Sequence, residues 1–308
     1  MRRAATPMRY SFQRYLAAKK TVDDRALHPR LWDGLAQALA RRHGEAEVRI
    51  AEAGAGIGTM LERMLERNLA PRAAYLGVDE QAANVRQAPR RLRRWARANG
   101  LQARSLRGGA LELSGPGRAW TAHFEHADAL ASDAVRHGRA DLVVAHAFLD
   151  LVDLERALAR LLAWLAPGGL FYFTINYDGE TIVQPAHPLD ERVLQEYHRT
   201  MDERQRDGRP SGDSRTGRRL PGALQAAGAQ VLDVAASDWV VYPRRGAYPE
   251  DEAYFLHDLV HTVEGALRGC SRLESGALRE WVARRHQQVE RGELIWIAHQ
   301  LDVLGTVT

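Results

Sequence analysis

The chain has 308 residues, of which 45% are hydrophobic, so it is long enough for one large α/β domain with insertions. No uninterrupted apolar run approaches the ~18 residues of a transmembrane helix, so we expect no membrane span. Cys270 is the only cysteine, which excludes an intrachain disulfide and a cysteine-based zinc site. The formal net charge is only +4, and no apolar segment follows the two N-terminal arginines. The simplest expectation is a cytosolic protein.

Residues 10–43 are predicted to form two helices ahead of the first strand. Apolar residues recur there at helical spacing, and His28-Pro29 marks the break because the residue before a proline disfavours the helical conformation. We therefore describe residues 1–47 as an N-terminal helical extension. Ordinary packing of two amphipathic helices explains it, and so does a lid over a ligand.

The stretch Val48–Leu61 combines a short β-prone run, three glycines at alternate positions and the start of an apolar helical pattern. The glycines are Gly54, Gly56 and Gly58. A strand, a glycine turn and a helix make room for a nucleotide-like ligand beyond the end of the strand. Glycine suits such a turn because it adopts unusual backbone angles and lets a ligand approach the backbone closely.

The glycine spacing excludes two common nucleotide motifs. A G-x-G-x-x-G fingerprint would need its third glycine at Thr59 or Leu61, and no lysine completes a phosphate-binding P-loop. With Glu52 at the strand tip, the pattern acid-x-Gly-x-Gly-x-Gly resembles motif I of the class I S-adenosylmethionine (AdoMet) methyltransferases. The carboxylate suits the ligand's ammonium, and the free N–H groups of the helix suit its carboxylate. Another nucleotide, or a purely structural turn, is the alternative.

The next strand, residues 73–80, is short and apolar and ends in acids. Asp79 follows Gly58 by about 20 residues, the offset at which an acid meets the hydroxyls of a ribose. This arrangement resembles motif II of the same family. Asp79 also suits the N-cap of the following helix, and both roles are compatible.

Residues 86–97 carry most of a basic cluster on a predicted helix. The cluster comprises Arg86, Arg90, Arg91, Arg93, Arg94 and Arg97. A solvated helix face is the simpler reading, and a surface for an anion or a nucleic acid is the alternative. A β-hairpin is predicted around Ser114–Gly117, and its second arm supplies the third strand of the sheet.

The resemblance implies that Asp128 and Ala129 contact the adenine of the cofactor. An N-cap for a helix over residues 129–137 is the alternative for Asp128. Residues 142–145 are apolar without alternation, so both faces of this strand are buried and the sheet is parallel. His146 falls at the tip of this strand, where it can contact the cofactor or act as a base. A plain loop histidine is the other reading.

A leucine-rich helix, then Pro167-Gly168-Gly169 and a strand over residues 170–175, also resembles this family. The resemblance covers roughly residues 48–176. It implies an α/β fold with a doubly wound, mostly parallel seven-stranded sheet, helical cap insertions and an N-terminal helical extension. The expected parts are residues 1–47, the AdoMet-binding core 48–176, a substrate-cap insertion 177–219, and the rest of the core sheet 220–308 with a helical insertion 243–291.

The insertions supply candidate substrate contacts. Arg215 and Arg218 lie in a polar stretch that is either a solvated loop or a clamp for a substrate carboxylate. Tyr15 on the N-terminal extension and Tyr197 on a predicted helix are further candidates. His257-Asp-Leu-Val-His261 lacks the glutamate of the zinc motif H-E-x-x-H, so we expect no metal site.

These features predict AdoMet-dependent methyl transfer to a small molecule, with S-adenosylhomocysteine as product. The sulfonium already activates the methyl group, so no nucleophile motif is expected. Candidate bases are His146, Tyr177 and Glu180. The alternatives are a methyltransferase for nucleic acid or protein that uses the basic helix 86–97, and an AdoMet-binding protein without activity.

Overall fold

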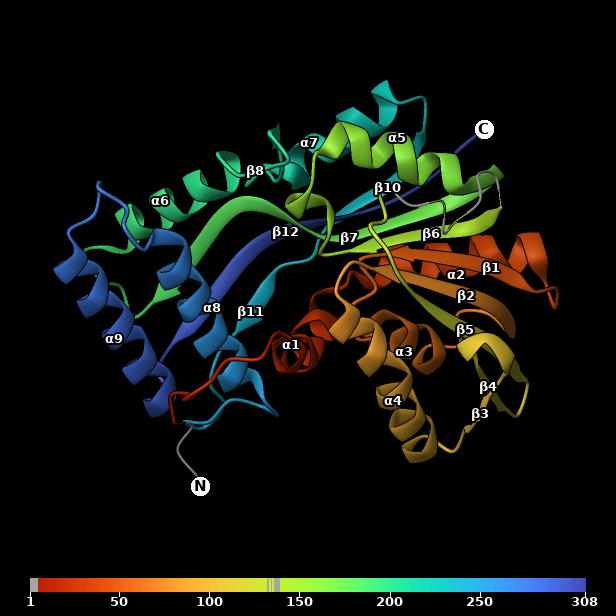
Figure 1. Ribbon diagram of the computed structural model, residues 1–308, viewed down its shortest axis with the longest axis horizontal. Helices are drawn as coiled ribbons and strands as arrows, with labels where there is room; N and C mark the ends of the chain where they lie inside the picture. Colours follow the sequence, from red (N-terminus) through yellow and green to blue (C-terminus); the bar gives the residue numbers. More distant parts are fainter. Residues whose placement is uncertain (1–4, 132, 134, 136–138) are drawn as a thin grey trace.

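The computed structural model describes residues 5–131, 133, 135 and 139–308. Seven strands follow the order β10-β12-β7-β6-β1-β2-β5, with β12 antiparallel to both of its neighbours and the other contacts parallel (Figure 1). The strands are β1 (Val48–Ala53), β2 (Arg72–Asp79), β5 (Arg118–His126), β6 (Ala140–His146), β7 (Leu165–Gln184), β10 (Gln230–Ala236) and β12 (Ile295–Thr306). The predicted mostly parallel seven-stranded sheet is confirmed.

Three further strands enlarge this sheet. The expected hairpin at residues 114–117 is present, with β4 (Leu111–Gly115) antiparallel to β5, and β3 (Gln102–Ser105) pairs with the outer side of β4. At the other end, β11 (Trp239–Val241) pairs with β12. The described part of the sheet therefore has ten strands. A separate hairpin joins β8 (Gln205–Arg206) to β9 (Arg209–Pro210).

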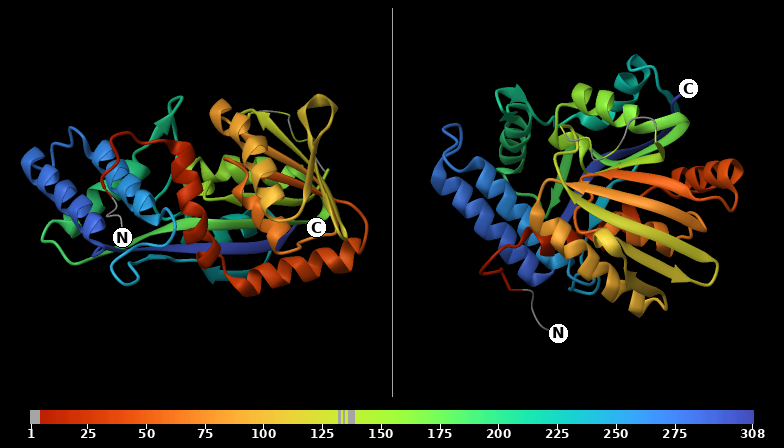
Figure 2. Two further views of the ribbon diagram at one scale, coloured as in Figure 1. Left: turned by 90° about the horizontal axis from the view of Figure 1, so that it is seen from below. Right: turned by 45° about the vertical axis from the view of Figure 1, so that its right-hand side comes forward.

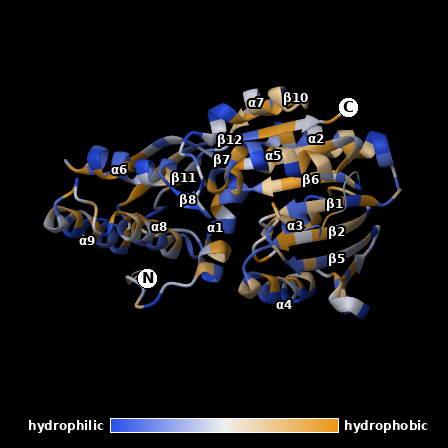
Figure 3. Cartoon of the chain, turned by 45° about the horizontal axis from the view of Figure 1, so that its top comes forward, coloured by the Kyte–Doolittle hydropathy of each residue, from blue (hydrophilic) through white to orange (hydrophobic). Residues whose placement is uncertain are grey.

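Helices cover both faces of the sheet, because alternate strand residues point to opposite sides. Ile50 of β1 belongs to one buried cluster and its neighbour Ala51 to the other. The first cluster includes residues of α2 (Pro29–His43), α3 (Thr59–Glu66) and α4 (Ala82–Ala98). The second includes residues of α5 (Leu154–Trp164) and α7 (Thr216–Ala226). Figure 3 shows hydrophobic residues concentrated on the central strands between these layers.

A helical cap lies beside one end of the sheet. It comprises α1 (Phe12–Ala26), α6 (Asp190–Asp202), α8 (Glu252–Leu267) and α9 (Ser275–Arg291). Strands β7 and β12 run out of the sheet into this cap, as Figures 1 and 2 show. The boundary expected between residues 176 and 177 therefore falls inside one continuous strand, β7. Because β7 belongs to both parts, it fixes the position of the cap relative to the carboxyl ends of the other strands.

Two 3-10 turns complete the described elements, η1 (Arg107–Gly109) and η2 (Leu149–Leu151). The second follows β6 directly and places its residues at the end of the sheet that faces the cap. In the part of the chain that the structure describes, no helix is both long and apolar enough to cross a membrane.

Candidate functional site

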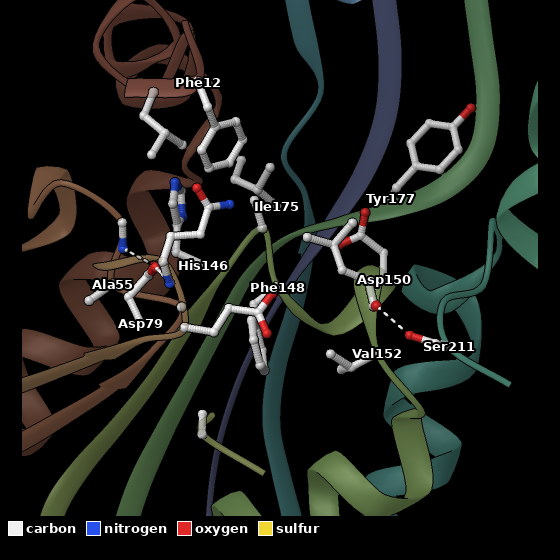
Figure 4. Close-up of a pocket in the computed structure, with 18 of the residues that line it drawn as sticks. Phe12, Ala55, Asp79, His146, Phe148, Asp150, Val152, Ile175, Tyr177 and Ser211 are labelled. Carbon is white, nitrogen blue, oxygen red and sulfur yellow. Dashed lines mark hydrogen bonds between the residues drawn. The ribbon is translucent and has the colours of Figure 1, made fainter. Parts of the chain in front are cut away.

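A cavity of about 720 Å³ lies between the carboxyl ends of the central strands and the cap. Its wall takes residues from β1, β2, β6 and β7 and from α1, α6 and α8 (Figure 4). Ten of the residues predicted from the sequence line it: Tyr15, Glu52, Gly54, Gly56, Asp79, Asp128, Ala129, His146, Tyr177 and Tyr197. The fold thus brings together residues that are up to 182 positions apart in the chain (Tyr15 and Tyr197).

The glycine turn after β1 needs glycine at each of its three positions. The φ angles are 68° at Gly54, 55° at Gly56 and 83° at Gly58, and residues other than glycine rarely adopt such values. A Cβ atom on Gly54 would also lie 2.6 Å from the ring of Phe148. Gly58 begins α3 against Phe124 and does not line the cavity, so its role is to shape the turn.

Asp79, at the end of β2, holds the glycine turn in place. One carboxylate oxygen accepts a hydrogen bond from the Gly56 N–H at 2.8 Å, and the other accepts from the Gln81 N–H at 2.8 Å and Asn84 Nδ2 at 3.1 Å. The bond to Gln81 lies just before α4, but the N-cap residue of that helix is Gln81, so Asp79 is not the N-cap. Each carboxylate oxygen has about two acceptor sites, so Asp79 can accept a further bond from a ligand hydroxyl.

Glu52 is a buried carboxyl group whose protonation depends on what occupies the cavity. Its side chain is 2% exposed, and the Tyr75 hydroxyl donates to Oε2 at 2.5 Å. Burial raises the pKa of Glu52 to about 8, although the bond from Tyr75 and the charge of Arg63 pull it down. A cation bound nearby would favour the ionised form.

Asp128 and Ala129 lie on the cavity wall after β5. The Leu130 N–H donates to Asp128 Oδ1 at 2.8 Å, which closes a tight turn. The helix expected over residues 129–137 lies partly outside the described residues. In the described part, residues 129–131 form a turn.

His146 belongs to a buried ionic cluster beneath the cavity. Its Nε2 lies 2.9 Å from Asp23 Oδ2, and its Nδ1 lies 2.8 Å from the Thr174 hydroxyl. Burial lowers the pKa of His146 to about 4. In the neutral ring, the contact with the carboxylate places the hydrogen on Nε2, and Nδ1 then accepts from Thr174. Both ring nitrogens of His146 are used within the protein, so neither is free to take a proton from a substrate.

The other members of this cluster anchor the lid helix α1 to the core. Asp23 accepts from Lys19 Nζ at 2.6 Å and from Trp239 Nε1 at 2.9 Å, and it lies 3.3 Å from Arg63. Nearby Lys19, His146 and Arg63 hold the pKa of Asp23 well below its ordinary value against the effect of burial. Lys19 is thus part of a structural ion pair and also lines the cavity.

Asp150 is a cavity residue that the sequence did not identify. It lies in η2 after β6, and Figure 4 places it on the opposite side of the pocket from Asp79, with Phe148 between them. Its Oδ1 is buried and accepts no hydrogen bond from the described residues. Burial raises the pKa of Asp150 to about 6, even though the positive charges of Lys19 and Arg204 lower it.

Three tyrosines surround the part of the cavity that contains Asp150. The negative charge of Asp150 contributes to the raised pKa values of Tyr15, Tyr177 and Tyr197, after the larger effect of burial. The Tyr177 hydroxyl lies 2.7 Å from Thr181 Oγ1 and 2.6 Å from a histidine nitrogen of α6, so its position is fixed. The pKa of Tyr177 is raised mainly by burial, so the deprotonated form that could act as a base is scarcely present near neutral pH.

Besides Gly58, three predicted site residues lie outside the cavity wall. Glu180 is exposed, and Arg218 pairs with Asp178 at 2.8 Å in support of β7. Arg215 packs beside Gly179. None of the three lines the cavity. All three come after residue 176, where the sequence suggested that the chain leaves the sheet. The sequence does not show on which side of the sheet the residues after that point lie.

The motif His257–His261 is part of the packing of the cap. His257 Nδ1 lies 2.8 Å from His286 Nδ1, and His261 stacks on Tyr10 with ring centroids 4.0 Å apart. Among the described residues, no group of three His, Cys, Asp or Glu side chains is placed to hold a metal ion.

The basic residues of α4 are arranged as a solvated helix face predicts. Arg90, Arg94 and Arg97 are exposed, whereas Leu92 and Ala96 are buried against the sheet. None of these arginines lines the cavity.

Two contacts close the cavity above Asp79. Arg206 of the β8–β9 hairpin lies 2.6 Å from Glu80, the residue after Asp79. Gln13 of α1 donates to Asn84 Oδ1 at 2.9 Å. Two segments that are distant in the chain, α1 and the β8–β9 hairpin, therefore reach across the carboxyl end of β2.

Residues 51–171 match the family model described as a methyltransferase domain. Among solved structures, the chain is similar to geranyl diphosphate C-methyltransferase from Streptomyces coelicolor A3(2), with 12% identity over 90% of this chain and 77% of that one (TM-score 0.43). A putative methyltransferase from Bacillus halodurans C-125 shows 11% identity over 90% of this chain and 99% of that one (TM-score 0.48).

A third similar structure is a putative sarcosine dimethylglycine methyltransferase from Galdieria sulphuraria. It shows 12% identity over 90% of this chain and 85% of that one (TM-score 0.43). No curated protein matches the chain.

Proposed function

Since this chain belongs to the class I AdoMet-dependent methyltransferases, we propose that it transfers the methyl group of AdoMet to a small-molecule nucleophile. The observation that supports this most is that one cavity joins the glycine turn and Asp79 to a tyrosine-lined compartment around Asp150. A volume of about 720 Å³ falls within the ~300–1,000 Å³ range of small-molecule sites. The single cysteine, Cys270, fits a reducing compartment such as the cytosol.

The cofactor is assigned to the wall formed by β1, β2 and the loop after β5. Glu52 would bind the ammonium of AdoMet, and Asp79 would accept hydrogen bonds from the ribose hydroxyls. Asp128 and the backbone of Ala129 would contact the adenine. The close approach of the ligand to Gly54 and Gly56 explains why side chains are absent at these positions on the cavity wall.

The acceptor is assigned to the compartment around Asp150. AdoMet supplies an activated methyl group, so the protein has to align the nucleophile with it and to exclude water. We assign Asp150 as the base that takes the proton of the acceptor, because its buried Oδ1 has a free acceptor site in the cavity wall. The acceptor then attacks the methyl carbon while the bond from that carbon to sulfur breaks, which yields S-adenosylhomocysteine.

Replacing Asp79 with Asn tests the cofactor assignment. We expect the affinity for S-adenosylhomocysteine, measured by calorimetry, to fall at least about tenfold, because a hydrogen bond to a charged group contributes ~1.5–3 kcal/mol. Thermal unfolding of the empty variant should also occur at a lower temperature, because Asp79 holds Gly56 and Gln81. An Asp33→Asn variant, changed on the exposed side of α2 and outside the cavity, is the matched control. Failure of the wild type to bind S-adenosylhomocysteine would refute the proposed function.

Glu52 should couple cofactor binding to proton release. Burial raises its pKa to about 8 in the empty cavity, whereas a ligand ammonium favours the carboxylate. Binding of S-adenosylhomocysteine at pH 7 should therefore release close to one proton, and affinity should rise with pH up to about 8. Calorimetry in buffers of different ionisation enthalpy measures this release, which Glu52→Gln should abolish. An equal proton release from Glu52→Gln would contradict the assignment.

The raised pKa of Glu52 also makes the stability of the folded chain depend on pH. A higher pH lowers this stability, whereas it favours binding of the cofactor. The pKa of Glu52 in the folded chain lies above its ordinary value of 4.5. The stability that this proton provides is therefore full below pH 4.5 and is lost as the pH rises through about 8. Glu52→Gln should remove this part of the pH dependence of unfolding of the empty protein.

A further inference from the structure

We propose that the methyl acceptor is an amine, bound as a cation between Asp150 and Asp258 among aromatic rings. This inference rests on the proposed function and names the chemical class of its acceptor. It depends on the charges and rings that face the acceptor compartment, and on which of those charges already have a partner within the protein.

Two carboxylates reach the same part of the compartment from different elements. Asp150 lies in η2, Asp258 lies on α8, and both line the cavity. Their negative charges both contribute to the raised pKa of Tyr15, after burial and the charge of Asp23, so Tyr15 lies within reach of the two. Burial also raises the pKa of Asp258 to about 6, which shows that the compartment is poorly solvated on this side as well.

The cations nearest to this compartment do not neutralise both carboxylates. Lys19 is paired with Asp23 at 2.6 Å. Arg204 lines the cavity and lowers the pKa of Asp150, but the buried Oδ1 of Asp150 accepts no hydrogen bond from the described residues. A buried carboxylate oxygen without a partner is costly, and an ammonium from the ligand would supply the missing donor.

The rings of the compartment suit a cation as well. The aromatic residues that line the cavity are Phe12, Tyr15, Phe148, Tyr177, Tyr197, Trp239 and Trp296. Phe12 and Tyr15 stack with centroids 5.8 Å apart, and Tyr15 also stacks on Phe255 of α8 at 5.5 Å. The faces of such rings attract ammonium groups, and the attraction is strongest where water is excluded.

An anionic or a hydroxyl acceptor fits these observations less well. A phenolate or a carboxylate would have to approach Asp150 and Asp258 with like charge, and Lys19 is already paired with Asp23, which leaves Arg204 to offset that charge. An amine instead gains from both acids. Asp150 takes one proton from the ammonium, and the neutral amine then attacks the methyl carbon of AdoMet. The products are the methylated ammonium, S-adenosylhomocysteine and protonated Asp150, which returns its proton to solvent.

Binding of three matched probes to the protein loaded with S-adenosylhomocysteine tests this inference. The probes are benzylamine, benzyl alcohol and benzoate, which share a ring and differ in charge. We expect benzylamine to bind at least about tenfold more tightly than benzyl alcohol, because a desolvated ammonium gains from the carboxylates and the rings. Benzoate should bind most weakly. With AdoMet in place of the product, mass spectrometry should detect methylated benzylamine and little methylated benzyl alcohol.

Two variants separate the amine site from general effects of charge. Asp150→Asn should remove most of the preference for benzylamine and leave the affinity for benzyl alcohol unchanged. Asp33→Asn, which removes an exposed carboxylate from α2 outside the cavity, should change neither affinity.

Benzyl alcohol or benzoate binding as tightly as benzylamine, or a preference that survives in Asp150→Asn, would overturn the inference. Binding of S-adenosylhomocysteine without a preference for the amine would leave the proposed methyl transfer intact and overturn only the amine assignment. Loss of both would overturn the proposed function itself.

Discussion

Replacing Asp150 with Asn should lower kcat by about 10²–10⁴-fold, the range that a positioned general base contributes. The affinity for S-adenosylhomocysteine should change little, because Asp150 lies across the pocket from Asp79 and the rest of the cofactor wall (Figure 4). Steady-state kinetics with an accepted amine and calorimetry with S-adenosylhomocysteine measure the two effects separately. A kcat equal to that of the wild type would show that another group removes the proton.

The pH profile provides an independent reading of the same residue. Burial raises the pKa of Asp150 to about 6, with Lys19 and Arg204 lowering it and Asp213 raising it. In the wild type, kcat/KM should therefore fall as the pH drops through about 6, because the carboxylate becomes protonated and cannot act as a base. Asp150→Asn should lack this acidic limb. An acidic limb of the same shape in the variant would assign the titration to another group.

Replacing Asp23 with Asn should destabilise the protein by about 3–5 kcal/mol, the cost of breaking a buried ion pair on one side. The change leaves Lys19 and Arg63 buried without the charge of the carboxylate that they share. The one oxygen of the asparagine also cannot replace both carboxylate oxygens, which accept from Lys19 and from Trp239. Denaturant unfolding of the empty protein measures the loss. The pKa of Asp23 lies well below its ordinary value, so its contribution to stability is present above pH 3.8 and is lost as the pH falls below that value.

Asp24→Asn is the matched control for this experiment. Asp24 also pairs with Arg63, but its side chain is 28% exposed, whereas that of Asp23 is 2% exposed. An ion pair that water can reach contributes less to stability, so the control should cost clearly less. Equal losses for the two variants would mean that burial does not set the energy of the cluster.

The sheet and the glycine turn after β1 were predictable because both leave local signals in the sequence. The glycine turn and the apolar strands mark positions where few residue types are tolerated, and the offset between Gly58 and Asp79 follows from the length of one βα unit. The hairpin at residues 114–117 was predictable because a Gly-Pro-Gly turn separates two runs of strand-forming residues. These signals depend on neighbours in the chain, and the structure agrees with them.

The acceptor compartment was not predictable because its chemistry arises between distant elements. Asp150 is one acid in a polar loop, and only the cap from α1 and α6 buries it. His146 could not be assigned to an ion pair, because its partner Asp23 lies 123 residues earlier on a helix with no motif of its own. The placement of Arg215 and Arg218 depends on β7 continuing to residue 184, where the sequence suggested an exit from the sheet at residue 176.

We expect this protein to transfer the methyl group of AdoMet to a small molecule inside the cavity. The most direct test is to incubate the protein with methyl-labelled AdoMet and a mixture of small molecules, RNA and protein from cells, and then to follow the label. We predict that the label enters a small molecule whose mass rises by one methylene group, and that Asp79→Asn and Asp150→Asn both reduce this transfer. Label in RNA or protein, or equal labelling by both variants, would contradict the account.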